Sequence, residues 1–136
     1  MPQLKAQSLF KTNSIPLKGQ RSYWHVKSFA EKSLVIYDKT LNYNGLVVFL
    51  AENPTEAMQI EESISFFNTG QSTNKSIEIL NFPDWETLPY DQFSPHQDII
   101  SQRLKTLYQL PNVKKGLLIL SISTLLQRVI PHSFID

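Results

Sequence analysis

Apolar residues recur at helical spacing in three parts of the chain. Between residues 22 and 41 they follow one another every three or four positions, which predicts a first helix. A second helix is predicted after Asn53, with Asn53 as its cap and the apolar positions of residues 57–67 on one face. A third pattern begins near Asp98 and ends before Pro111.

Three further segments have the composition of strands. Residues 45–51 and 116–122 are continuous apolar runs, which are typical of strands buried on both faces of a parallel sheet. Residues 76–80 alternate between polar and apolar and predict a shorter strand. After the last strand, Ser123 or Thr124 is expected to cap a short helix that runs to Arg128.

The predicted order is helix, strand, helix, strand, loop, helix, strand, helix. This alternation indicates an α/β fold, a three-layer sandwich with a mostly parallel sheet and right-handed crossovers. Residues 1–20 lack periodicity and are interpreted as an irregular leader, and residues 21–136 as one α/β domain.

Composition excludes several classes of site. The 136 residues include no cysteine, so disulfides and thiolate metal sites are impossible, and the three histidines lack metal-ligand spacing. The formal charge of +1 offers no argument for nucleic acid or membrane as a partner. No apolar run approaches the roughly 20 residues of a membrane span, and no signal peptide is recognisable, so we expect a cytoplasmic protein.

The loop after the predicted middle strand is unusually rich in rings, prolines and acids. Its aromatic residues could stack on bases, but no basic stripe lies between them, so packing anchors or a partner-binding ridge are expected. Its carboxylates could form a catalytic or metal cluster, but their spacing fits turn and cap chemistry. His96 and Asp98 could likewise be an acid–base pair or the end of a loop that caps a helix.

Phosphate-binding motifs are missing from the sequence. A P-loop needs GxxxxGK[ST], because backbone N–H groups wrap the phosphate while the lysine supplies charge. Neither this motif nor GxGxxG occurs, and only Gly19 lies close to the first predicted helix. The residues themselves therefore predict no catalytic, cofactor-binding or metal-binding site.

Several strings closely resemble the N-terminal region of the bacterial transcription-repair coupling factors (Mfd), and the likeness covers residues 45–136. The strings are Asp84-Trp85-Glu86-Thr87-Leu88-Pro89-Tyr90-Asp91, Phe93-Ser94-Pro95-His96, Ile99-Ile100-Ser101-Gln102-Arg103-Leu104, Thr124-Leu125-Leu126-Gln127-Arg128-Val129 and Pro131-His132-Ser133-Phe134. The family motif residues, expected to act structurally or in a partner loop, are Asp84, Trp85, Glu86, Leu88, Pro89, Tyr90, Asp91, Phe93, Pro95, His96, Asp98, Arg103 and Arg128.

The resemblance implies a degenerate P-loop helicase-like fold, similar to domain 1a of the repair protein UvrB, without its ATP site or its damage-probing hairpin. It implies a parent protein that is an ATP-dependent DNA translocase, removes stalled RNA polymerase and recruits UvrA in nucleotide excision repair. ATP and Mg²⁺ would belong to a downstream motor, so no cofactor is expected here. The main UvrA contacts would lie beyond Asp136, and this part would be a non-catalytic scaffold that contacts other domains of the parent.

Two other functions stay open at this stage. The chain could be a nucleotide-binding α/β enzyme fragment whose site has no recognised motif. It could also bind nucleic acid directly, through the aromatic loop and the basic residues near the N-terminus, which are Lys5, Lys11, Lys18 and Arg21. Nucleotide binding would distinguish the first alternative, and DNA affinity that falls steeply with salt would distinguish the second.

Overall fold

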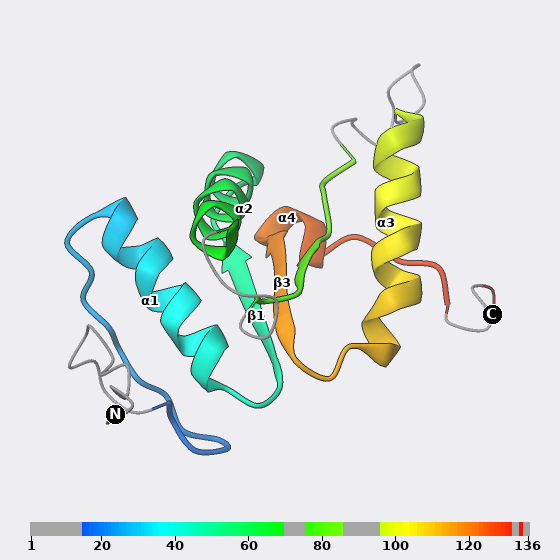
Figure 1. The fold of residues 1–136 in the computed structure, drawn as a ribbon. Coiled ribbons are helices and arrows are strands. Elements are labelled where there is room, and N and C mark those ends of the chain that lie inside the picture. Colours follow the sequence, from blue (N-terminus) through cyan, green and yellow to red (C-terminus); the bar gives the residue numbers. More distant parts are fainter. Residues whose placement is uncertain (1–14, 70–75, 86–95, 132–133, 135–136) are drawn as a thin grey trace.

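The fold is built on a small parallel sheet of three strands in the order β1-β3-β2 (Figure 1). The computed structural model describes residues 15–69, 76–85, 96–131 and 134. The strands are β1 (Leu46–Ala51), β2 (Ile79–Asn81) and β3 (Gly116–Ser121). β3 pairs with β1 from Leu46↔Gly116 to Ala51↔Ser121 and with β2 from Ile79↔Leu117.

Helices connect the strands and cover both faces of the sheet. They are α1 (Phe29–Asn42), α2 (Pro54–Thr69), α3 (Gln97–Gln109) and α4 (Ile122–Leu125), with a 3₁₀ turn, η2 (Leu110–Asn112), after α3. The alternating order predicted from the sequence is therefore confirmed, as is the α/β class with a parallel sheet. Among the described residues, no helix is long and apolar enough to cross a membrane.

The core divides into two clusters because successive side chains of a strand point to opposite faces. On one face, Leu117 and Ile119 of β3 are buried with residues of α1 and α2, including Tyr37, Ile60 and Ile64. On the other face, the buried side chains are Leu80, Phe82, Leu118 and Leu120, and Leu107 of α3 and Leu110 of η2 pack against them. The sheet thus lies between two helical layers, as predicted.

β1 differs from its prediction. Its apolar run predicts burial on both faces, but Val48 is 51% and Leu50 45% exposed. Val47, Phe49 and Ala51 face the α1–α2 core, so Val48 and Leu50 point to the opposite face. β1 is the edge strand on that face, whereas the central strand β3 is buried at every position.

α1 begins later than the periodicity predicts. Residues 22–28 are not helical, and the helix starts at Phe29 with Ser28 as its cap. The Ser28 hydroxyl accepts the Glu31 N–H at 3.2 Å, and the Glu31 carboxylate accepts the Lys27 N–H at 2.6 Å. This Ser-x-x-Glu arrangement fixes the start of the helix, and a periodicity count passes over it.

Of the other predicted element boundaries, one is confirmed and two differ from the structure. Asn53 caps α2 as predicted, because its side-chain oxygen accepts the Glu56 N–H at 2.9 Å. β2 lies later than the predicted 76–80 and begins at Ile79. The prediction that Ser123 or Thr124 caps the last helix is wrong, because Ser121 at the end of β3 is the cap and the helix ends at Leu125.

Candidate functional site

The carboxyl edge of the sheet is the natural place for a site. Parallel strands all end at this edge, and open α/β sheets bind ligands just beyond it. Here β1 turns into α2, β3 turns into α4, and residues 82–85 leave β2 (Figure 1). Two groups of polar side chains meet at this edge, one at the start of α2 and one around Arg103.

The N-terminus of α2 is occupied by a carboxylate of the chain itself. Glu56 accepts the Glu52 N–H at 2.7 Å through one oxygen and pairs with the Lys32 ammonium at 2.6 Å through the other. The hydrogen bond from Lys32 and that from the Glu52 N–H lower the pKa of Glu56, despite some burial. A helix N-terminus attracts anions, so this position would be the place for a phosphate. Glu56 fills it with negative charge instead.

Arg103 of α3 is the centre of the second group. Its side chain is only 3% exposed and donates to the Pro83 carbonyl at 2.6 Å and to the Gln127 amide oxygen at 3.0 Å. Its guanidinium carbon lies 4.2 Å from the Phe82 ring centre and 4.1 Å from that of Trp85. Burial lowers the pKa of Arg103, and the nearby Asp84 charge opposes that change.

Asp84 completes this group with three hydrogen bonds. It accepts from the Ser123 hydroxyl and the Gln127 amide, both at 2.5 Å, and from the Trp85 N–H at 2.7 Å. Burial alone would raise the pKa of Asp84, but these hydrogen bonds and the Arg103 charge outweigh it and lower the pKa. Phe82, Asp84, Trp85, Arg103 and Gln127 are referred to as the Arg103 cluster.

The start of α4 is joined to this cluster through hydroxyl groups. Ser121 is 2% exposed, and its hydroxyl accepts the Thr124 N–H at 3.2 Å. It also lies 2.8 Å from the Ser123 hydroxyl, which in turn donates to Asp84. On the other side, Thr106 of α3 donates to the Asn81 carbonyl at 2.7 Å. The cluster thus ties α3 and α4 to the segment that leaves β2.

The space between the two groups is small. A cavity of about 150 Å³ lies between the start of α2, the end of β3 and residues 81–84. Pockets that hold nucleotide-sized ligands usually measure about 300–1,000 Å³. Asp84 is the only ionisable residue among the described ones that line it, and the others include Pro54, Ala57, Met58 and Phe82. This cavity therefore gives no support to a nucleotide site.

The structure brings some predicted residues together and separates others. Asp84, Trp85 and Arg103 are in one cluster. His96 and Asp98 form a pair at the start of α3, where His96 Nδ1 lies 3.3 Å from the carboxylate and accepts the Asp98 N–H at 3.4 Å. Their side chains are 75% and 90% exposed, which fits the capping interpretation rather than an acid–base pair. Arg128 is exposed beyond α4.

Other predicted residues cannot be placed. Glu86, Leu88, Pro89, Tyr90, Asp91, Phe93 and Pro95 lie outside the described residues. Whether the aromatic loop packs on the sheet or contacts a partner therefore stays a prediction. Within the described residues, no group of three or more histidine, aspartate or glutamate side chains could hold a metal ion.

Sequence analysis did not identify three residues of the hydrogen-bond network around Arg103 and Asp84. Gln127, Ser123 and Ser121 lie 24, 20 and 18 positions after Arg103, and no local pattern connects them with it. Gln127 does lie inside the string Thr124–Val129, which belongs to the family resemblance, so its presence there was the one available signal. Phe82 opens the aromatic run and could be recognised only as one of several rings.

Comparison with known proteins gives one consistent result. No protein-family model matches the chain. Over 91 residues, 67% of this chain, it is 53% identical to the transcription-repair-coupling factor of Escherichia coli K12. It is 58% identical to that of Haemophilus influenzae Rd over 104 residues and 35% identical to that of Rickettsia prowazekii over 101 residues. The chain spans only 7–8% of the length of these relatives.

Proposed function

Because the chain belongs to the transcription-repair-coupling factor family, matching a small N-terminal part of its members, we propose that it is a non-catalytic scaffold of such a protein. In this proposal the parent protein couples transcription to DNA repair, as the name of its relatives says. The parent moves on DNA by hydrolysing ATP, displaces stalled RNA polymerase and recruits UvrA. This chain contributes a folded support for those activities.

The state of the α2 N-terminus is the observation that carries this proposal. A P-loop domain places the nucleotide phosphates at the N-terminus of a helix that follows a strand of its parallel sheet. Here α2, which follows β1, begins with Asn53 and Pro54, and the Glu56 carboxylate accepts the Glu52 N–H and pairs with Lys32. A phosphate would have to displace this carboxylate or lie beside it, at a cost in charge repulsion. A UvrB-like fold that has lost its nucleotide site accounts for this arrangement.

The Arg103 cluster, at the carboxyl edge of the same sheet, is a second argument for the scaffold role. Its charged and polar side chains are engaged with one another and with backbone carbonyls. Such an arrangement fixes the directions in which residues 82–85 and 122–131 leave the sheet. In the parent, we propose that these segments lead to the partner contacts, which include other domains and UvrA.

Titration of Mg-ATP into the 136-residue chain tests the non-catalytic part of the proposal. We expect no binding heat up to millimolar nucleotide, while a P-loop ATPase measured in the same buffer gives a normal isotherm. The competing function is a nucleotide-binding enzyme fragment. Saturable heat with a Kd in the micromolar range, made tighter by Glu56→Gln because the competing carboxylate charge is removed, would establish that function instead.

A further inference from the structure

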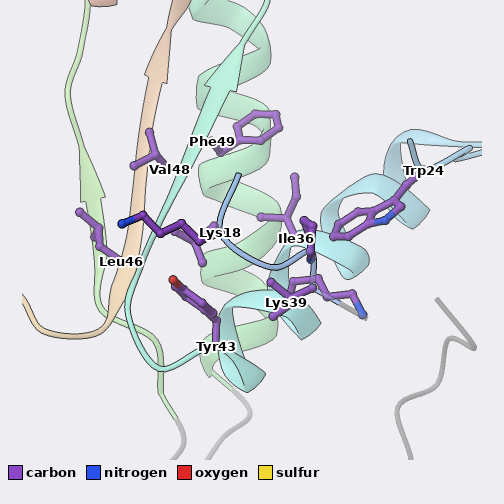
Figure 2. A pocket seen from close by; sticks show the side chains of 11 residues that line it. Lys18, Trp24, Ile36, Lys39, Tyr43, Leu46, Val48 and Phe49 are labelled. Atoms are coloured by element: carbon purple, nitrogen blue, oxygen red, sulfur yellow. The ribbon is translucent and has the colours of Figure 1, made fainter. Parts of the chain in front are cut away.

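A second hollow lies away from the carboxyl edge, between α1, β1 and the segment 15–24 (Figure 2). Its volume is about 550 Å³, more than three times that of the cavity beside Asp84. Ile36 of α1 and Val47 and Phe49 of β1 provide an apolar floor. This site is referred to as the β1 hollow.

The rim of the β1 hollow is positively charged. Of the described residues that line it, Lys18 and Lys39 are charged and none is acidic. Lys18 is exposed and forms no ion pair with a described residue. Lys39 lies 5.6 Å from the Trp24 ring centre and 3.7 Å from the Asp38 carboxylate. In Figure 2 the two ammonium groups point in opposite directions, with apolar side chains between them.

An unsatisfied donor lies at the same place. The indole N–H of Trp24, which also lines the hollow, is buried and has no hydrogen-bond acceptor among the described residues. A buried polar group without a partner destabilises a protein, so such groups are rare unless a bound molecule supplies the partner. The Trp24 N–H is an observation independent of the lysines, and because the nitrogen is enclosed by protein atoms, an oxygen of a bound molecule reaches it only when the indole turns toward the hollow.

We propose that the β1 hollow is a docking site for an extended peptide segment in which large apolar side chains adjoin acidic residues. The apolar side chains would enter above Ile36 and Phe49, a carboxylate would pair with Lys18 or Lys39, and an oxygen of the segment would accept the Trp24 N–H. Among the described residues β1 pairs only with β3 and is an edge strand, which leaves room for an extended chain alongside it.

The segment comes from another region of the same long polypeptide, so this step rests on the proposed function. The relatives are about nine times the length of this chain, because 67% of the chain covers only 7% of the Escherichia coli protein. Exposed ion pairs and one apolar anchor give weak binding, which suffices when a tether supplies millimolar effective concentration. Residues 1–14 do not qualify as the occupant, because they contain two lysines and no acidic residue.

The chemistry of the hollow can be tested with peptides on the 136-residue chain. The probes are the fluorescein-labelled peptide SGLFEELGS and its SGLFQQLGS and SGLFKKLGS counterparts, followed by fluorescence anisotropy. We expect the acidic peptide to bind about fivefold or more tightly than the glutamine peptide, and the lysine peptide more weakly still. Equal binding of the three peptides, or none, would overturn the proposal.

Variants locate the peptide on the molecule. Lys18→Gln and Lys39→Gln are each expected to weaken the acidic peptide several-fold, and Lys105→Gln, an exposed lysine of α3, to leave it unchanged. In ¹⁵N spectra, the Trp24 indole signal should shift on binding while that of Trp85 stays in place. Binding that ignores both lysines, or that shifts only Trp85, would place the peptide elsewhere and refute the site.

Carbodiimide cross-linking of the full-length polypeptide identifies the source of the segment. This reagent joins an amine to a carboxylate only when the two are in contact. We expect Lys18 or Lys39 to be linked to an acidic residue of the same polypeptide outside this chain, more often than Lys105. Links from these lysines only to a different protein would overturn the intramolecular source but keep the site. No ATP or UvrA measurement enters this test, so it can fail independently of the scaffold proposal.

Discussion

At the residue scale, the buried side chain of Arg103 contacts several segments that meet at the carboxyl edge. A buried guanidinium must satisfy its donors, and here the Pro83 carbonyl and the Gln127 amide do so while two rings lie beside its carbon. Asp84 is near enough to influence its pKa without forming a direct ion pair. The guanidinium therefore connects α3 with two segments that are remote in sequence.

Trp85→Ala removes one of the two rings beside Arg103. The Trp85 side chain is partly buried, so we expect the free energy of unfolding to fall by about 1–3 kcal/mol, less than for a fully buried tryptophan. Trp85→Phe keeps a ring and should recover more than half of that loss. Urea unfolding followed by circular dichroism measures both. A Trp85→Ala midpoint equal to that of the wild type would contradict the contact.

Asp84→Asn tests the charge of the cluster. The folded-state pKa of Asp84 is lowered, so its ionised form stabilises the fold above the unfolded pKa, and this contribution is lost as pH falls through the folded pKa. The variant should therefore be less stable than the wild type at pH 7, and the difference should shrink below about pH 4. Urea midpoints at pH 7, 5 and 3 measure this. A difference that does not change with pH would contradict it.

At the residue scale, the sequence identified several members of the Arg103 cluster but did not predict that they are in contact. The family strings contain Asp84, Trp85, Arg103 and Gln127, yet nothing in their spacing shows that they converge. Their contacts depend on how α3 crosses the sheet, because Arg103 reaches residues 20 and 24 positions away. Side-chain networks of this kind are tertiary, so periodicity does not predict them.

At the scale of elements, the apolar patterns predicted the α-helices and strands of the described residues in the right order but not their ends. The two strands with continuous apolar runs lie at 46–51 and 116–121, close to their predictions. Their burial differs because only β3 is central, and strand order is not encoded in the local pattern. The start of α1 and the cap of α4 were misplaced because hydroxyl caps outweigh the apolar spacing around them.

Ser121→Ala tests the correction at α4. The Ser121 hydroxyl is buried, accepts the Thr124 N–H and contacts the hydroxyl of Thr124, so we expect a loss of about 1–2 kcal/mol in unfolding free energy. Ser101→Ala on the exposed side of α3 is the matched control and should be neutral or slightly stabilising. Thermal unfolding of the two variants measures this difference in stability. Equal melting temperatures of the two variants would show that the Ser121 cap does not stabilise the fold.

At the scale of the whole molecule, the carboxyl edge of the sheet and the outer side of β1 have different characters. The carboxyl edge, where an α/β domain would bind nucleotide, is filled by the Glu56 carboxylate and the Arg103 cluster. The β1 hollow on the α1 side is larger, apolar at its floor and basic at its rim. These two features are the ones on which the proposed scaffold role and the proposed docking site rest.

The affinity of UvrA for this chain, compared with a polypeptide extended past residue 136, tests the scaffold account most directly. Surface plasmon resonance with immobilised UvrA would compare the two chains at the same salt concentration. The account predicts that only the extended polypeptide binds, because recognition lies beyond Asp136 and this chain supports it. Binding of the 136-residue chain alone, with an affinity near that of the longer one, would contradict the account and make this domain a recognition element itself.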